Sequence, residues 1–222
     1  MKKIFFVFAV CCVAITATAD VVRVNSFKQN NSAYQKETAK VRDLTDNSGA
    51  MGKGFCPFAI GLLPGVEIPA ENWDVFFLRI NIFVGRHNSV YGLDLGCVGN
   101  EVKNNFIGVQ SAGIYNKIGY SDGALQFAGI VNRSLGDFYG VQAASILNST
   151  DGMLTGLQIG VLNRATVLSG LQLGLVNIAR AGSGVQLGVW NSAKNFEGLQ
   201  IGLGNYNEGS SLEFSPIMNL GF

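Results

Sequence analysis

Charge of either sign is scarce in this sequence, and neither sign dominates. Charged residues make up 14% of the 222 residues, with 16 lysines and arginines against 15 acids. Removing the leader described below takes away Lys2 and Lys3, which leaves fourteen basic residues against fifteen acidic ones. A nucleic-acid-binding surface needs concentrated positive charge. The composition therefore excludes nucleic acid as an expected partner.

Histidine and the common catalytic motifs are rare or missing. His87 is the only histidine, and it lies in the turn-like stretch 85–88, which predicts an exposed side chain without a second metal ligand nearby. There is no Gly-x-Ser-x-Gly elbow and no phosphate loop. The acids that fall in the repeats are scattered among different copies: Asp94, Asp137 and Glu197. We expect no catalytic residue, no metal site and no cofactor, and we do not expect an enzyme.

Long apolar runs are missing after residue 19, where no uninterrupted run reaches about 18 residues. Before it, Met1 to Ala19 combines Lys2 and Lys3 with an apolar run and small residues at its end. This pattern predicts a secretory signal peptide cleaved after Ala19, and therefore an exported chain. An alternative is a lipoprotein acylated at Cys11 or Cys12, although Phe8 to Cys11 matches that signal poorly.

Two cysteines, Cys56 and Cys97, remain after the leader. An oxidising exported setting favours a disulfide. They lie forty-one residues apart in different segments, and two small buried thiols are an equal alternative.

The segment 20–54 is polar and charged, unlike the rest of the chain. Val21 to Phe27 has the alternation of a first short strand, and Ser32 to Leu44 has the composition of a surface helix. A solvated linker is the alternative for the helix, because Asp46-Asn47-Ser48-Gly49 is rich in turn formers.

The stretch 92–205 contains one short phrase eight times, seen most clearly as Gly-Leu-Gln-Leu-Gly-Leu-Val-Asn at residues 170–177. Its third position is Asp94 in the first copy and glutamine afterwards. The spacing is sixteen residues four times and then fourteen residues three times. The glutamines form a predicted polar face of the repeat: Gln110, Gln126, Gln142, Gln158, Gln172, Gln186 and Gln200.

Period-two alternation within each copy predicts short β-strands, with aliphatic residues on one face and glutamine and glycine on the other. Recurrent glycine predicts close backbone approach or tight curvature. Phe55 to Leu63 and Val75 to Gly85 are two further predicted strands. The links contain Asp-Gly and Asn-Glu-Gly sequences typical of hairpin turns, which favour antiparallel neighbours.

We therefore expect an all-β domain over 55–222, an antiparallel meander of Gly-rich strands closing into a shallow β-barrel of about 12 strands. Closure removes the exposed edges of so long a sheet. The alternative is a β-solenoid in which glutamines and asparagines stack in ladders. The polar second half of each repeat argues against it, because it offers little to a second buried face.

The last segment, 212–222, alternates up to a terminal phenylalanine. This pattern resembles the closing strand of bacterial outer-membrane barrels. The resemblance implies an assembly signal formed by Phe222, Leu220 and Met218.

The phrase at 170–177 resembles the repeats of uncharacterised bacterial surface-repeat proteins of the Leptospira type, over roughly residues 55–205. It is also similar, more weakly, to shallow petal-like repeat barrels. The resemblance implies an exported, surface-associated protein and carries no catalytic residues.

These observations predict a non-enzymatic outer-membrane or cell-surface repeat protein with a structural or interaction role. Its expected partners are the cell envelope and an unidentified protein or lipid ligand. The alternatives are a small pore, a carrier of an apolar ligand, or a soluble periplasmic β-solenoid binding protein. The glutamine series either touches a ligand or satisfies its amides by hydrogen bonds between strands or to water.

Overall fold

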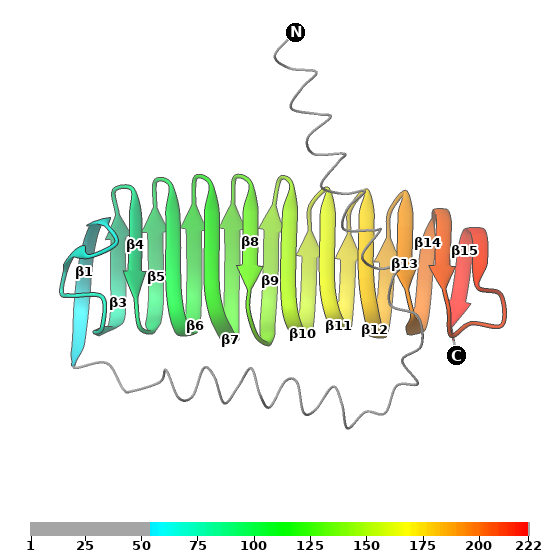
Figure 1. The fold of residues 1–222 in the computed structure, drawn as a ribbon, viewed down its shortest axis with the longest axis horizontal. Coiled ribbons are helices and arrows are strands. Elements are labelled where there is room, and N and C mark those ends of the chain that lie inside the picture. Colours follow the sequence, from blue (N-terminus) through cyan, green and yellow to red (C-terminus); the bar gives the residue numbers. More distant parts are fainter. Residues whose placement is uncertain (1–53, 222) are drawn as a thin grey trace, which may run out of the picture. The chain divides into compact units, whose positions relative to one another are not determined.

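A computed structural model describes residues 54–221, and all regular secondary structure in that range is β-strand (Figure 1). The predicted all-β class is confirmed. No helix in this range is long and apolar enough to cross a membrane. The predicted leader with its cleavage at Ala19, the segment 20–53 and Phe222 lie outside the described residues.

The strands form one 15-stranded sheet. They are β1 (Phe55–Leu63), β2 (Val66–Ile68), β3 (Asp74–Asn81), β4 (Val84–His87), β5 (Val90–Gly96), β6 (Gly99–Ala112), β7 (Tyr115–Ala128), β8 (Val131–Ser134), β9 (Phe138–Ala144), β10 (Leu147–Ile159), β11 (Leu162–Leu173), β12 (Val176–Leu187), β13 (Trp190–Ala193), β14 (Asn195–Asn207) and β15 (Phe214–Gly221).

Strands from successive repeats pair in parallel. In the pair β11–β12, Asn163 lies beside Asn177 and Gln172 beside Gln186, so equivalent residues of successive repeats are neighbours. Each repeat is thus one coil, and the coils stack in chain order from β3 to β14 (Figure 1). The predicted antiparallel meander closing into a barrel of about 12 strands is wrong: the chain forms a β-solenoid.

The links were misinterpreted because turn-forming residues also occur inside strands. Ser121, Asp122 and Gly123 lie within β7, and Asp151 and Gly152 lie within β10. The tight corner of each coil falls instead inside the repeated phrase, for example between β11 and β12. A chain that turns at every phrase in the same sense brings equivalent strands together in parallel.

The second half of each coil does contribute to the core. A column of buried side chains runs through most coils, four positions before Arg79, Asp94 or a repeat glutamine: Val75, Val90, Phe106, Phe138, Leu154, Leu168 and Phe196. Two positions after each asparagine, the buried side chains are Val102, Ile118, Ser134 and Thr150 in the longer coils and Ala165, Ala179 and Ala193 in the shorter ones. Both halves of each coil therefore contribute side chains to the close-packed interior.

Antiparallel strands lie at both ends of the stack. β2 pairs with residues 60–63 of β1, and β15 pairs with β14. β1 spans the same residues as the predicted strand Phe55 to Leu63, whereas the predicted strand Val75 to Gly85 is divided between β3 and β4. Met218 and Leu220 are exposed on β15, and they sit in an antiparallel end strand rather than a barrel-closing one.

Candidate functional site

The seven repeat glutamines form one continuous ladder inside the solenoid. From Gln126 onward, each Nε2 donates to the Oε1 of the glutamine one coil earlier, over 2.7 to 2.9 Å. All seven side chains are buried. The predicted polar face is therefore an internal hydrogen-bond ladder between coils, and it does not meet an external ligand.

The asparagines that end each phrase form a second ladder, from Asn81 to Asn205. Here each Nδ2 donates to the Oδ1 of the following coil, in the direction opposite to the glutamines. The amide also donates across the corner: Asn163 Nδ2 lies 2.8 Å from the backbone oxygen of Leu173. Each asparagine thereby ties two coils and two segments of one corner together.

The opposed directions explain two buried acceptors that have no hydrogen-bond partner. Asn81 begins the asparagine ladder, so no earlier asparagine donates to its Oδ1. Gln200 ends the glutamine ladder, so no later glutamine donates to its Oε1. Each ladder ends where the repeats end.

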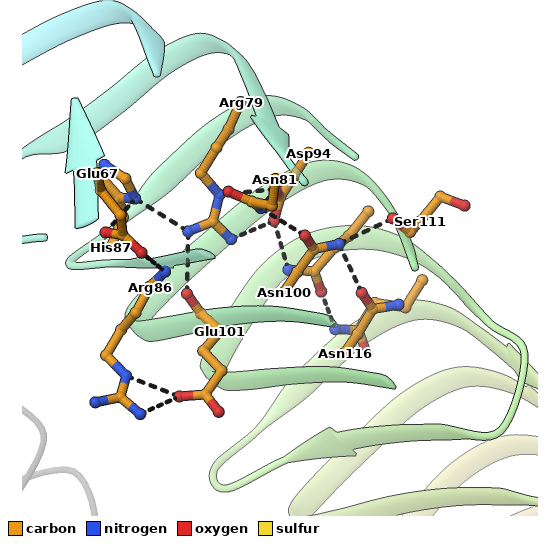
Figure 2. Close-up of polar contacts among 12 residues, drawn as sticks. Glu67, Arg79, Asn81, Arg86, His87, Asp94, Asn100, Glu101, Ser111 and Asn116 are labelled. Atoms are coloured by element: carbon orange, nitrogen blue, oxygen red, sulfur yellow. Dashed lines mark hydrogen bonds and ion pairs between the residues drawn. The ribbon is translucent and has the colours of Figure 1, made fainter. Parts of the chain in front are cut away.

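A buried ion pair terminates the glutamine ladder at its N-terminal end (Figure 2). Gln110 Nε2 donates to Asp94 Oδ2 over 2.7 Å. Arg79 grips both oxygens of the same carboxylate, with Nε to Oδ1 at 2.7 Å and Nη2 to Oδ2 at 2.6 Å. Both side chains have no exposed surface. A carboxylate only accepts, which suits the end of a ladder that needs an acceptor, and the bidentate guanidinium balances its charge.

His87 lies against Arg79, at the end of β4. Its Nδ1 is 3.2 Å from Arg79 Nη1 and 3.4 Å from Glu67 Oε2, and the ring is fully buried. The expectation of an exposed turn histidine is wrong. Arginine can only donate, so Nδ1 accepts and the ring is neutral. Burial, and then the charge of Arg79, lower the pKa of His87 to about 3. Burial raises the pKa of the neighbouring Glu67 carboxyl above 4.5.

The pKa of His87 predicts a specific acid sensitivity. Unfolded His87 takes up its proton near pH 6.5, whereas the folded ring does so only near pH 3. The unfolded chain therefore binds more protons in this window, and stability falls as the pH falls through it. Glu67 acts in the opposite sense, because a raised carboxyl pKa stabilises the fold below 4.5 and that stabilisation is lost as the pH rises through the folded value.

Because the chain has one histidine, its ring proton shifts in NMR can be followed as a function of pH without assignment by mutation. We expect no titration of the folded ring above about pH 4. His87→Leu should lose part of the acid dependence of the free energy of unfolding. A folded ring that titrates near pH 6.5 would contradict the assignment.

Arg79 lies between Asp94 and His87 and contacts both (Figure 2). Within residues 54–221, no three His, Cys, Asp or Glu side chains are grouped so that they could hold a metal ion. Cys56 and Cys97 are both free. The Arg79–Asp94 pair ends the glutamine ladder.

The outer surface of the coils is divided by charge. The eight copies of the phrase contain no lysine, arginine or glutamate, and their one aspartate is the buried Asp94. In each phrase, the two residues that flank the glutamine (or Asp94) point outward. The residues at the corner that follows them in the same phrase also point outward. We call these residues the uncharged side. Its most exposed large members are Leu93, Leu95, Val109, Ile114, Leu125, Phe127, Ile159, Val161, Leu175, Val189, Trp190, Ile201 and Leu203.

All charged residues between 101 and 197 lie in the links. The exposed basic ones include Lys103, Lys117, Arg133, Arg164 and Arg180. An open groove crosses the uncharged side where small residues replace large ones at the corners of three coils. It is lined by Ser111, Ala112, Phe127, Ala128, Gly129, Ala143, Ala144, Ser145 and Ile159.

Sequence reasoning missed Arg79 and the role of Asp94. The available signal was positional, since Asp94 occupies the glutamine position of the first phrase and Arg79 lies fifteen residues earlier. Only stacking of β3 on β5 places Arg79 beside Asp94.

No family model, curated protein or solved structure matches this chain.

Proposed function

We propose that this chain is a non-enzymatic, exported β-solenoid that acts as a binding protein in the bacterial cell envelope. The observation that carries the proposal is the exclusion of every exposed charge from one side of eight successive coils. The glutamine and asparagine ladders do not require the absence of charge from this outer side, because their amides are buried inside the solenoid. An outward position on a solenoid tolerates charge, as the links show.

The size of the uncharged side also supports binding. Eight coils at the spacing of paired strands extend about 38 Å, and four residues of strand are about 13 Å wide, so the surface covers roughly 500 Å². Apolar patches on soluble monomers reach this size mainly where they are functional. The groove on this side is open, so it does not enclose a small molecule as a ligand pocket does. A macromolecular partner fits this surface better than a carried small ligand.

Cysteine protection tests the proposal. In a background of Cys56→Ser and Cys97→Ser, we would place one cysteine on the uncharged side as Ile159→Cys and one on a charged link as Arg164→Cys. Both parent residues are exposed. Labelling by a maleimide-polymer reagent is measured in native envelopes and on purified protein.

We expect at least tenfold slower labelling at position 159 in envelopes than in purified protein, with less than twofold change at position 164. Equal slowing at both positions reports general shielding and not a docking surface, and an unchanged rate at 159 rejects the function.

A further inference from the structure

The N-terminal coils carry a concentration of highly exposed apolar side chains. Seven residues of β1, β2 and β3 are each 57 to 79% exposed, and we call them the end patch: Phe55, Phe58, Ile60, Val66, Ile68, Phe76 and Phe77. By comparison, the outward residues beside the repeat glutamines reach only 37 to 43%. Highly exposed apolar residues are therefore denser in the end patch than beside the repeat glutamines.

The end-patch residues lie on three strands that pair side by side, in the order β2, β1 and β3. The rings of Phe58 and Phe77 meet edge to face with centroids 5.8 Å apart. Ile60 of β1 lies opposite Ile68 of β2, and Phe76 contacts Tyr91 of the next coil at 6.4 Å between centroids. Sheet pairing therefore holds both aromatic and aliphatic members in place.

The end patch is large enough for a stable protein interface. Four phenylalanines of about 200 Å² each, at 58 to 65% exposure, present roughly 500 Å², and the three aliphatic residues raise the total to about 800 Å². That exceeds the patches of ordinary monomers. Two such surfaces pressed together bury about 1,600 Å², the standard size of a specific protein interface.

The charges nearest the end patch disfavour a phospholipid surface. Arg86 is paired with Glu101 at 2.7 Å, and Lys103 is paired with Glu71 at 3.1 Å. These basic groups are already engaged by acids of the same chain, which reduces their attraction for anionic headgroups. An uncharged surface is in contrast suited to an identical copy of itself, because identical charges would repel across a twofold axis.

Backbone pairing is not the expected mode of contact. β2 covers only residues 60–63 of β1, but Pro57 lacks the N–H that a further strand on the remaining part of β1 would need. This end of the sheet therefore supports contact through side chains instead.

We infer that the end patch is the contact between two copies of this chain, joined about a twofold axis through their N-terminal coils. The inference stands on the exposure and area of residues 55–77 and is independent of the proposed function.

Light scattering and sedimentation of the purified protein between about 1 and 100 μM test it. We expect the parent to have twice the chain mass at the upper concentrations. Phe58→Ser with Phe77→Ser should weaken dimerisation at least 100-fold. Ile68→Lys should do the same, because it places like charges opposite each other while changing a side chain that is 79% exposed.

The matched control is Leu175→Ser with Leu203→Ser, which removes two exposed apolar residues from other coils and should leave the dimer unchanged. Flotation with phosphatidylcholine and phosphatidylglycerol vesicles provides the second arm. A parent that is monomeric at 100 μM, or an Ile68→Lys protein that dimerises like the parent, overturns the inference. Vesicle binding by a monomeric parent that Ile68→Lys abolishes would identify the patch as a lipid contact instead. Slow labelling at position 159 in envelopes would still support the proposed binding function, whether or not the end patch forms a dimer.

Discussion

Gly170→Ala is expected to destabilise the solenoid by about 3–5 kcal/mol, through backbone strain together with overpacking. Gly170 has φ of 146°, and a Cβ there would lie 2.1 Å from the backbone oxygen of Gly156 in the preceding coil. Neither atom can move without breaking the parallel pairing of β10 and β11. The same collision recurs at Gly184 and Gly198, which accounts for glycine at the first position of seven of the eight copies, with Ala124 as the exception.

The control for this substitution is Gly123→Ala. A Cβ at Gly123 has no atom within 4 Å, so we expect a change of less than about 0.5 kcal/mol in the free energy of unfolding. Urea denaturation followed by circular dichroism measures both variants. Similar small effects at the two positions would show that the coils do not approach as closely as the structure places them.

Arg79→Met is expected to cost about 3–5 kcal/mol, because it leaves the buried carboxylate of Asp94 without its countercharge. Arg79 also donates to the backbone oxygen of Glu101 over 3.1 Å, and the substitution removes that hydrogen bond as well. Thermal unfolding at neutral pH should show the effect as a large drop in the midpoint.

The repeat itself supplies a rescue for this site. Arg79→Gln combined with Asp94→Gln continues the glutamine ladder by two coils and removes both charges. Replacing a buried ion pair by satisfied neutral groups is often neutral or stabilising, so the double variant should recover most of the stability that Arg79→Met loses. A double variant as unstable as Arg79→Met would mean that the pair has a role beyond terminating the ladder.

Several features were predictable from local pattern alone. Period-two alternation identified strands, and it correctly placed glutamine on one face and aliphatic residues on the other, since successive side chains of a strand point to opposite sides. The need to satisfy buried amides led to hydrogen bonding as one reading of the glutamine series. The structure shows this as bonds from each glutamine to the next coil.

The same local pattern misled the choice between barrel and solenoid. Alternation is identical in parallel and antiparallel sheets, so it says nothing about strand direction. The second half of each repeat looked too polar for a core, yet Ala165, Ala179 and Phe196 are buried there. A coil of fourteen residues needs few large side chains inside, because the two amide ladders already occupy much of its interior.

The sequence by itself determined that this chain is an all-β repeat protein, where the repeats lie, and that the phrase in each repeat carries no charge apart from Asp94. These properties depend only on residues a few positions apart in the sequence. Tertiary structure alone decided that β6 to β14 stack in parallel, that Arg79 meets Asp94, and that His87 is buried. The physical reason is that these contacts join residues in different coils or strands, and they exist only once the direction of each corner has set which backbone lies beside which.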